Sequence, residues 1–174
     1  MTSLIDLPQP GENNTITAVI EIPSGSRQKI EYDQDNDCFR LDRMLPIAMP
    51  ANYGFVPRTV CDDGDAMDIL VLGNDVFATG TVLEVKPIGI LYMIDEDQYD
   101  PKVLSIPDYM ELSELDMCVR DGRRTRSIYG NIINFFKQYK GEGHTTVGDT
   151  VYPVTNAVLE IDEALIEYFK ETRQ

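Results

Sequence analysis

Short apolar runs separated by turn residues fill the first two thirds of the chain, and this alternation most constrains its fold. Turn residues such as Pro23-Ser24-Gly25, Asp62-Asp63-Gly64 and Pro87 interrupt the runs. The spacing predicts strands at 17–22, 28–32, 38–42, 55–61, 68–72, 81–86, 88–94 and 102–106. Strands this short and evenly spaced are typical of a closed barrel or a sandwich.

Two segments near the C-terminus change to helical periodicity. Apolar side chains recur every three or four residues between Arg124 and Lys140. A second pattern begins at Asn156, a candidate N-cap, and ends near Thr172, with a buried face expected at Val158, Ile161, Leu165 and Phe169. Strands first and helices second predict an α+β fold, and the length of 174 residues favours a single domain over residues 1–174.

The charge balance excludes several classes of partner. The chain carries 30 Asp and Glu against 15 Lys and Arg, a formal net charge of −15. A protein that binds the phosphate backbone of nucleic acids needs a basic face, and anionic membranes attract basic segments. We therefore expect no nucleic-acid partner and no membrane partner. No stretch approaches 18 apolar residues, and the N-terminus lacks the pattern of a signal peptide.

The numbers and spacing of cysteine and histidine limit the cellular compartment and the kinds of catalytic or zinc site that the chain can form. Cys38, Cys61 and Cys118 are widely spaced and never form a CxxC pair, which favours reduced thiols in a cytoplasmic protein. His144 is the only histidine. A Ser-His-Asp or Cys-His site would need that residue, and zinc sites built on several histidines are excluded by count.

Carboxylates gather at the ends of very apolar strands. Four acids lie within residues 62–68 and four within 95–100. Isolated acids in turns are normally solvated, but two groups brought together repel one another, and hard divalent cations usually resolve this repulsion. A third group at Asp33, Asp35 and Asp37 starts like an EF-hand, yet Cys38 and Met44 stand where that loop needs Gly and Glu.

A series of motifs then resembles the family I soluble inorganic pyrophosphatases. Asp63-Gly64-Asp65-Ala66-Met67-Asp68 resembles their D-x-D-P-x-D signature, with Ala66 in place of the usual Pro. The other matches, in register from about residue 19 to 140, are Val19–Pro23, Lys29–Tyr32, Leu41–Arg43, Pro50–Pro57, Lys86–Gly89, Asp95–Lys102 and Phe135–Lys140.

This resemblance implies a fold and an activity. The fold is a five-stranded, OB-like closed β-barrel with two flanking C-terminal α-helices. The activity is Mg²⁺-dependent hydrolysis of inorganic diphosphate to two phosphates by a metal-bridged water or hydroxide, with several Mg²⁺ ions in each site. Such a site needs no histidine, because bound metal ions lower the pKa of water. The alternative is an inactive module of the same fold that binds metal or phosphate compounds.

The resemblance also implies roles for residues at the matching positions. Asp65 would be the general base, with Tyr53 and Arg43 as further catalytic residues. The implied metal ligands are Glu21, Glu31, Asp63, Asp68, Asp95 and Asp100. The implied contacts to substrate phosphate are Lys29, Arg43, Tyr53, Lys102, Tyr139 and Lys140.

The segment before Pro50 departs from the family pattern, and so does the expected assembly. Residues 43–50 are a residue or two short, and Met49 stands where the family has a Tyr. Bacterial members often form hexamers that use histidines in the long helix, and Asn134 and Gln138 occupy the comparable positions here. We expect a homo-oligomer, with a hexamer as the state that the resemblance implies.

Overall fold

The computed structural model describes residues 2–10, 14–121, 124–141 and 143–172. Of residues 118–121 and 124–126 it describes the backbone alone.

Five strands close into a barrel at the centre of the molecule. They are β1 (Ile16–Ile22), β4 (Asn52–Phe55), β5 (Asp68–Val71), β9 (Lys102–Pro107) and β6 (Val82–Leu91). Each strand pairs with the next in that order, and β6 pairs back with β1, which closes the ring. The pairing of β5 with β9 is parallel and the others are antiparallel. The closed five-stranded barrel predicted from the resemblance is therefore confirmed.

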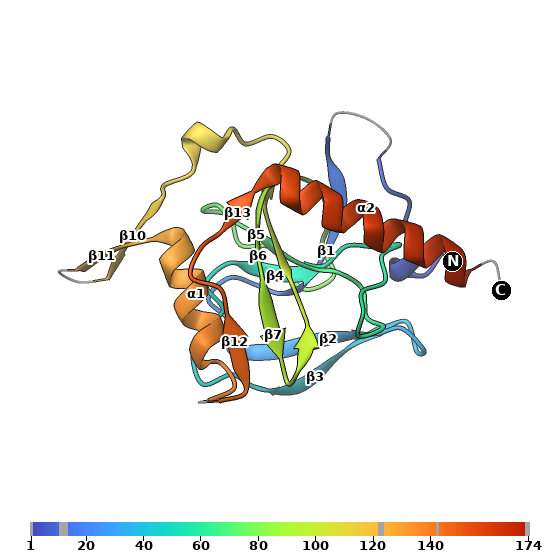
Figure 1. Cartoon of the computed structure of the whole chain (residues 1–174), viewed down its shortest axis with the longest axis horizontal. Helices are drawn as coiled ribbons and strands as arrows, with labels where there is room; N and C mark the ends of the chain where they lie inside the picture. The colour runs from blue at the N-terminus through green and yellow to red at the C-terminus, as the bar shows by residue number, and fades with distance from the viewer. Residues whose placement is uncertain (1, 11–13, 122–123, 142, 173–174) are drawn as a thin grey trace.

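Smaller strand pairs surround the barrel (Figure 1). A hairpin of β2 (Gln28–Asp33) and β3 (Cys38–Met44) lies below it in that view. A small sheet is formed by β7 (Met93–Asp95), β8 (Gln98–Tyr99) and β12 (Thr145–Val147). The remaining elements are β10 (Cys118–Asp121), β11 (Arg124–Ser127), β13 (Tyr152–Pro153) and two short 3-10 helices at Leu4–Asp6 and Leu112–Glu114.

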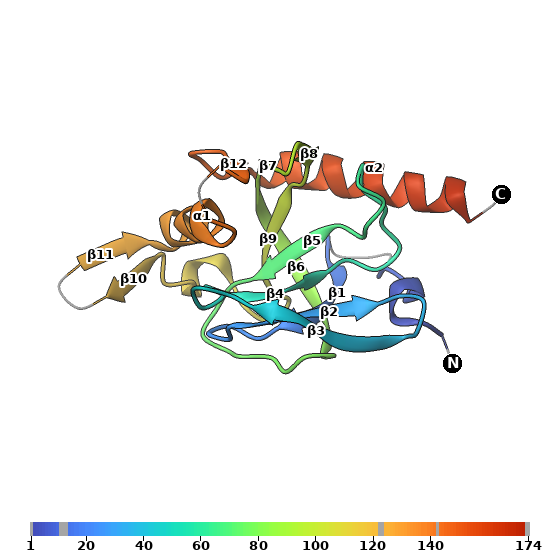
Figure 2. The ribbon, with the colours of Figure 1, turned by 90° about the horizontal axis from the view of Figure 1, so that it is seen from below.

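Two helices follow the strands, as the periodicity predicts. Helix α1 (Ile128–Gln138) is capped by Ser127, whose hydroxyl accepts a hydrogen bond from the Gly130 amide at 2.9 Å. Helix α2 (Val154–Glu171) crosses one side of the barrel, and Figure 2 shows α1 and α2 as separate elements beside the strands. The α+β assignment is confirmed.

The core consists of two main clusters that share the same strands. Leu70, Leu91 and Leu104 pack with α1, whereas their neighbours Ile69, Ile90 and Val103 pack with α2. Successive side chains of a strand point to opposite faces, so both faces of these strands are covered. This explains why their sequences are continuous apolar runs and do not alternate with polar residues.

Several predicted boundaries are wrong. The strand expected at 55–61 is β4 at 52–55, and the turn-rich segment after it forms the loop that enters the site. Strand β6 continues through Pro87, where its pairing with β9 shifts register, instead of breaking there. Residues 124–127 form β11 and not the first turn of a helix.

The second helix also differs from its prediction. It starts three residues earlier than expected, so Pro153 and not Asn156 is its N-cap. Ile161 is buried and Leu165 packs against the core as predicted, whereas Val158 and Phe169 are exposed. Ala157 and Ala164 complete the buried face. These small residues allow the helix to approach the barrel closely, and periodicity that counts only large apolar residues misses them.

Cys38 and Cys61 are free thiols in the described part of the chain. Within that part, neither helix is long and apolar enough to cross a membrane.

Candidate active site

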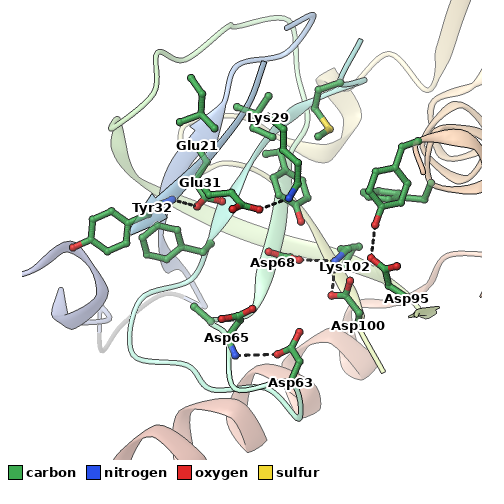
Figure 3. A pocket seen from close by; sticks show the side chains of 18 of the residues that line it. Glu21, Lys29, Glu31, Tyr32, Asp63, Asp65, Asp68, Asp95, Asp100 and Lys102 are labelled. Atoms are coloured by element: carbon green, nitrogen blue, oxygen red, sulfur yellow. Dashed lines mark hydrogen bonds and ion pairs between the residues drawn. The ribbon is translucent and has the colours of Figure 1, made fainter. Parts of the chain in front are cut away.

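A cavity of about 350 Å³ opens where the barrel meets the β2–β3 hairpin and α1 (Figure 3). All but one of the predicted site residues line it; the set comprises Glu21, Lys29, Glu31, Tyr53, Asp63, Asp65, Asp68, Asp95, Asp100, Lys102, Tyr139 and Lys140. Arg43 is the exception. It lines an adjoining cavity of about 480 Å³ that shares Glu96, Tyr139 and Lys140 with the first.

The loop between β4 and β5 presents three aspartates to the cavity. Its turn is closed by hydrogen bonds from Cys61 N to Asp65 O at 2.8 Å and from Gly64 N to Cys61 O at 2.9 Å. Gly64 has a φ of +87°, a conformation that glycine adopts without strain. The Asp65 amide donates to the Asp63 carboxylate at 3.0 Å, and Asp68 begins β5. The turn thus places two carboxylates of the signature side by side.

Lys102 lies in the deepest part of the site. Parallel pairing sets it opposite Asp68, and its side chain is only 2% exposed. Its ammonium donates to Asp68 at 2.5 Å and also to Asp100. Burial disfavours the charge, but the two carboxylates outweigh that effect and raise the pKa of Lys102. The lysine is held in its charged form between two acids.

One carboxylate oxygen of Asp95 accepts hydrogen bonds, whereas the other has no partner among the described residues. Its Oδ2 accepts hydrogen bonds from the Tyr139 hydroxyl and the Lys140 ammonium, each at 2.6 Å. Burial opposes ionisation of Asp95, but these two donors lower its pKa. Its Oδ1 is buried and has no hydrogen-bond partner among the described residues. A buried, unpaired oxygen costs free energy, which makes this atom a candidate ligand for a cation.

The turn that carries Asp95 is conformationally unusual. Strands β7 and β8 are joined at Glu96 and Asp97, which have φ values of +47° and +68°. Positive φ at both central residues is the tight hairpin turn that glycine and asparagine normally occupy. Strained backbone of this kind is common at functional sites. The turn pairs Asp95 with Gln98, and Asp100 follows β8 with its amide bonded to the Met93 carbonyl of β7 at 3.0 Å.

The β2–β3 hairpin supplies the opposite wall. The Lys29 ammonium pairs with Glu31 and, at 3.1 Å, with Asp42. Burial lowers the pKa of Lys29, but these two acids outweigh it and raise the pKa overall. Asp42 belongs to the same motif as Arg43, yet reasoning from the motif alone did not identify it as the partner of Lys29. Cross-strand pairing of Lys29 with Arg43 brings Asp42 within reach.

Tyr53 is placed by its neighbours in the Pro50–Pro57 block. The amide of Asn52 is buried and makes four hydrogen bonds, to Ser24, Val71, Asp75 and Phe77. A Cβ atom on Gly54 would lie 1.8 Å from the Val19 carbonyl oxygen, so only glycine allows β1 and β4 to approach this closely. The Tyr53 ring borders Lys102, whose ammonium is 6.0 Å from the ring centre. Burial is the main cause that raises the pKa of the Tyr53 hydroxyl, and the negative charges of Asp68 and Asp100 raise it further.

The carboxylates of the cavity repel one another. Eight carboxylates and three lysines line it. Burial raises the pKa of Glu21 to about 8 and that of Asp100 to about 6, with Asp68 contributing to both shifts. Burial also raises the pKa of Asp65, and Asp63 and Asp68 add to the effect. Burial is the largest cause of these shifts and repulsion between the acids adds to it, so an added positive charge in the cavity would favour their ionised forms.

This donor set fits hard divalent cations. Carboxylate oxygens are the ligands that such ions prefer, and the bare oxygen of Asp95 and the mutual repulsion of the acids both favour an added positive charge. Among the described residues, no three acidic, His or Cys side chains converge as a finished metal site. Lysines are instead paired with Asp68, Asp95, Asp100 and Glu31.

Comparison with known proteins decides the family. The sequence profile of the family described as "Inorganic pyrophosphatase" matches residues 18–169. The chain belongs to the inorganic pyrophosphatase family. It is 40% identical over 141 residues to the inorganic pyrophosphatase of Saccharolobus solfataricus, covering 75% of this chain and 78% of that one. It is 33% identical over 168 residues to that of Synechocystis sp., covering 94% and 97%.

Solved structures of the inorganic pyrophosphatase family agree with this assignment. The crystal structure of the Thermus thermophilus inorganic pyrophosphatase superposes with a TM-score of 0.81 at 33% identity, covering 96% of this chain and 99% of that chain. The inorganic pyrophosphatase from Neisseria gonorrhoeae superposes with a TM-score of 0.80 at 30% identity, covering 94% and 98%. The barrel and both helices are therefore those of the family.

Tyr32 is a contributor that the motifs did not single out. Its backbone amide donates to Glu21 Oε1 at 2.7 Å and holds that buried carboxyl in place. Its ring stacks on Phe55, with centroids 5.3 Å apart. The available signal was its position directly after the Lys29–Glu31 pair, because Tyr32 continues the same strand along the wall of the cavity.

We expect Glu21→Gln to stabilise the metal-free protein at pH 8 by about 2 kcal/mol, because the substitution removes a buried acid that resists ionisation. The folded-state pKa of about 8 exceeds the ordinary value of 4.5, so the free energy of unfolding of the wild type falls as pH rises between these values. Gln keeps an oxygen for the Tyr32 amide. Thermal unfolding in a chelator at pH 5 and pH 8 measures the difference, which should shrink at pH 5. A variant less stable than the wild type at pH 8 would contradict the burial argument.

Proposed function

We propose that this chain hydrolyses inorganic diphosphate to two phosphates with the help of bound Mg²⁺. One observation carries the proposal: motifs spread from Glu21 to Lys140 meet in a single cavity that combines many carboxylates with lysines, in a chain of the inorganic pyrophosphatase family. Carboxylates suit the cation, and lysines suit the phosphate oxygens.

The acidic residues divide into two roles in this proposal. Asp63, Asp68, Asp95 and Asp100 hold the metal ions directly, and Glu21 and Glu31 bind or support them from the outer wall. Mg²⁺, once bound, would neutralise the excess charge, lower the pKa of water and polarise the phosphoryl oxygens. Without such cations the cavity would repel diphosphate, because both carry net negative charge.

Asp65 is the proposed general base. The structure shows no hydrogen bond or ion pair to its side-chain carboxylate from the residues it describes, and its raised pKa makes it a better proton acceptor than an ordinary aspartate. Water attacks one phosphorus atom, Asp65 accepts a proton from that water, and the bond from this phosphorus to the bridging oxygen breaks. One phosphate carries the new oxygen, and the other leaves with the bridging oxygen.

The cations and tyrosines bind the substrate in this proposal. Lys29, Lys102 and Lys140 line the main cavity, and Arg43 faces the adjoining one. They would contact the phosphoryl oxygens and stabilise the charge that develops on the departing phosphate. The hydroxyls of Tyr53 and Tyr139 complete the set. Tyr139 already orients Asp95 through its hydrogen bond.

Phosphate release from inorganic diphosphate, measured with Mg²⁺ and in excess chelator, tests the proposal. We expect turnover that requires the metal. Absence of phosphate release with Mg²⁺ and with Mn²⁺ would overturn the proposed hydrolysis and support the inactive module. Release that continues in chelator would contradict the role of the carboxylates as metal ligands.

The cytoplasmic location, the single domain over residues 1–174 and the homo-oligomer stay predictions. A mass measurement in solution decides whether the hexamer forms with Asn134 and Gln138 at the positions where bacterial members often carry histidines.

A further inference from the structure

The two loops that carry the aspartates of the site both touch helix α2 on their outer side. The Tyr99 hydroxyl of β8 donates to Glu160 Oε1 of α2 at 2.8 Å. The Val60 amide, at the base of the loop between β4 and β5, donates to the Ala164 carbonyl of α2 at 3.0 Å. Figure 2 shows β8 and this loop both lying alongside α2.

Between these two contacts the loops stand away from the helix. A cavity of about 570 Å³ separates α2 from Cys61, Gly64, Tyr99 and Pro101. Dense packing therefore does not hold the loops against the helix over this region. The loops are joined to the helix on either side of this gap by the two hydrogen bonds described above, of which the Tyr99–Glu160 bond is exposed to solvent.

Each contact lies within three residues of an aspartate that lines the catalytic cavity. Tyr99 immediately precedes Asp100, and neighbouring residues of an extended segment point to opposite sides. Tyr99 therefore reaches α2 while Asp100 reaches Lys102. Val60 precedes the turn from Cys61 to Asp65 that carries Asp63. Movement of either contact would change the separation of Asp63 from Asp100.

Tyr99 is also held from its other side. Its ring stacks on Tyr92, with centroids 6.1 Å apart, and the Tyr92 hydroxyl accepts a bond from Asn156 of α2 at 3.4 Å. The hydroxyl of Tyr99 therefore has a defined direction toward Glu160. Glu160 is half-buried, unlike its exposed neighbour Glu163 on the same helix.

We propose that α2 braces the two aspartate loops and that Tyr99 and Glu160 are positioning residues for the metal-binding carboxylates. The inference rests on the proposed function, because it assigns the purpose of the brace to that site. Partners of metal ligands typically change metal affinity 10- to 100-fold when removed, although they never touch the ion.

Direct binding of Mn²⁺, followed by the electron paramagnetic resonance of the free ion, tests the brace without an activity assay. Tyr99→Phe removes the hydroxyl and keeps the ring, and Glu160→Ala removes the acceptor. We expect each to weaken Mn²⁺ binding about tenfold. Glu160→Gln keeps an acceptor oxygen and should restore binding. Glu163→Ala makes the same truncation on the same helix and should bind Mn²⁺ like the wild type.

The double variant Tyr99→Phe/Glu160→Ala completes a double-mutant cycle, which measures whether the two side chains act together. If the two side chains act through one bond, it should bind no more weakly than either single variant. Wild-type affinity in Tyr99→Phe, an equal loss in Glu163→Ala, or losses that multiply in the double variant would each overturn the brace. Circular dichroism checks folding, and Tyr99→Phe alone decides the question if Glu160→Ala fails to fold.

The two proposals fail in different ways. A wild type that binds Mn²⁺ with this variant pattern but releases no phosphate would overturn the hydrolysis and leave the brace standing. A wild type that hydrolyses diphosphate while Tyr99→Phe binds Mn²⁺ normally would overturn the brace alone. A wild type that binds no Mn²⁺ would overturn the brace as well.

Discussion

Replacing Asp65 with Asn should lower kcat for diphosphate by about 10²- to 10⁴-fold, because the variant lacks the proposed proton acceptor. Asn has nearly the same shape, and the hydrogen bond that holds the turn comes from the backbone amide of residue 65. Burial and the charges of Asp63 and Asp68 raise the pKa of Asp65, so loss of its charge also relieves repulsion. We therefore expect unchanged or slightly higher thermal stability together with the loss of activity.

Asp62→Asn provides the matched control for this experiment. Asp62 lies in the same loop but lines the cavity beside α2 and not the catalytic one. Asp62→Asn removes the same formal charge three residues before Asp65, and the kcat of this variant should stay near that of the wild type. Steady-state kinetics of both variants at saturating Mg²⁺ make the comparison. Equal activity in Asp65→Asn and the wild type would remove Asp65 from the mechanism.

Replacing Lys102 with Met should destabilise the metal-free protein by about 3 to 5 kcal/mol near pH 8, because it leaves buried carboxylates without their partner. Lys102 is 2% exposed and pairs with Asp68 and Asp100. Met fills much of the same volume, so the loss reports mainly the missing charge. Urea unfolding in chelator measures it, and activity should fall as well.

The pH dependence of this loss has a definite sign. Burial already raises the pKa of Asp100 to about 6, and removal of Lys102 must raise it further. Folding then favours the protonated acid, so the destabilisation is largest above pH 6 and smaller at pH 5. Added Mg²⁺ should also reduce the destabilisation caused by Lys102→Met, because the cation replaces the lost charge.

Lys137→Met provides the control for this experiment. It removes an exposed lysine that pairs with Asp149 and should change stability by about 0.5 kcal/mol or less. Stability of Lys102→Met equal to that of the wild type at pH 8 would contradict the buried-pair account.

The residues that line the cavity could be predicted well from the motifs, whereas their hydrogen-bond and ion-pair partners could not. Asp63, Asp65 and Asp68 lie within one short segment, so a single motif identifies them together. Lys102 between Asp68 and Asp100 depends on the parallel pairing of β5 with β9, two strands that lie 34 residues apart along the chain. The motifs predict Arg43 in the same site as the lysines proposed to contact phosphate, but the fold places it in the adjoining cavity.

The strands and helices likewise divide into parts that could be predicted from the sequence and parts that could not. Apolar runs predicted most of the barrel strands, because a buried strand must be apolar whatever its neighbours are. The segment at 55–61 was misassigned because turn chemistry, and not hydrophobicity, ends β4 at Phe55. Of the buried face predicted for helix α2, Ile161 and Leu165 are confirmed, whereas Val158 and Phe169 are wrong. Ala157 and Ala164 were missed because they carry little hydrophobic signal and are buried only through their approach to the barrel.

The sequence by itself determined the local chemistry of this protein: the acid-rich turns, the short apolar strands, the single histidine and the family to which these motifs belong. Such features lie within a few residues of one another, so short-range physics specifies them. The tertiary structure alone decided which charges neutralise which, and that α2 holds the Tyr99 and Val60 segments from outside. Those contacts join segments separated by 61 residues or more, and only the packing of the barrel against its helix sets their distances.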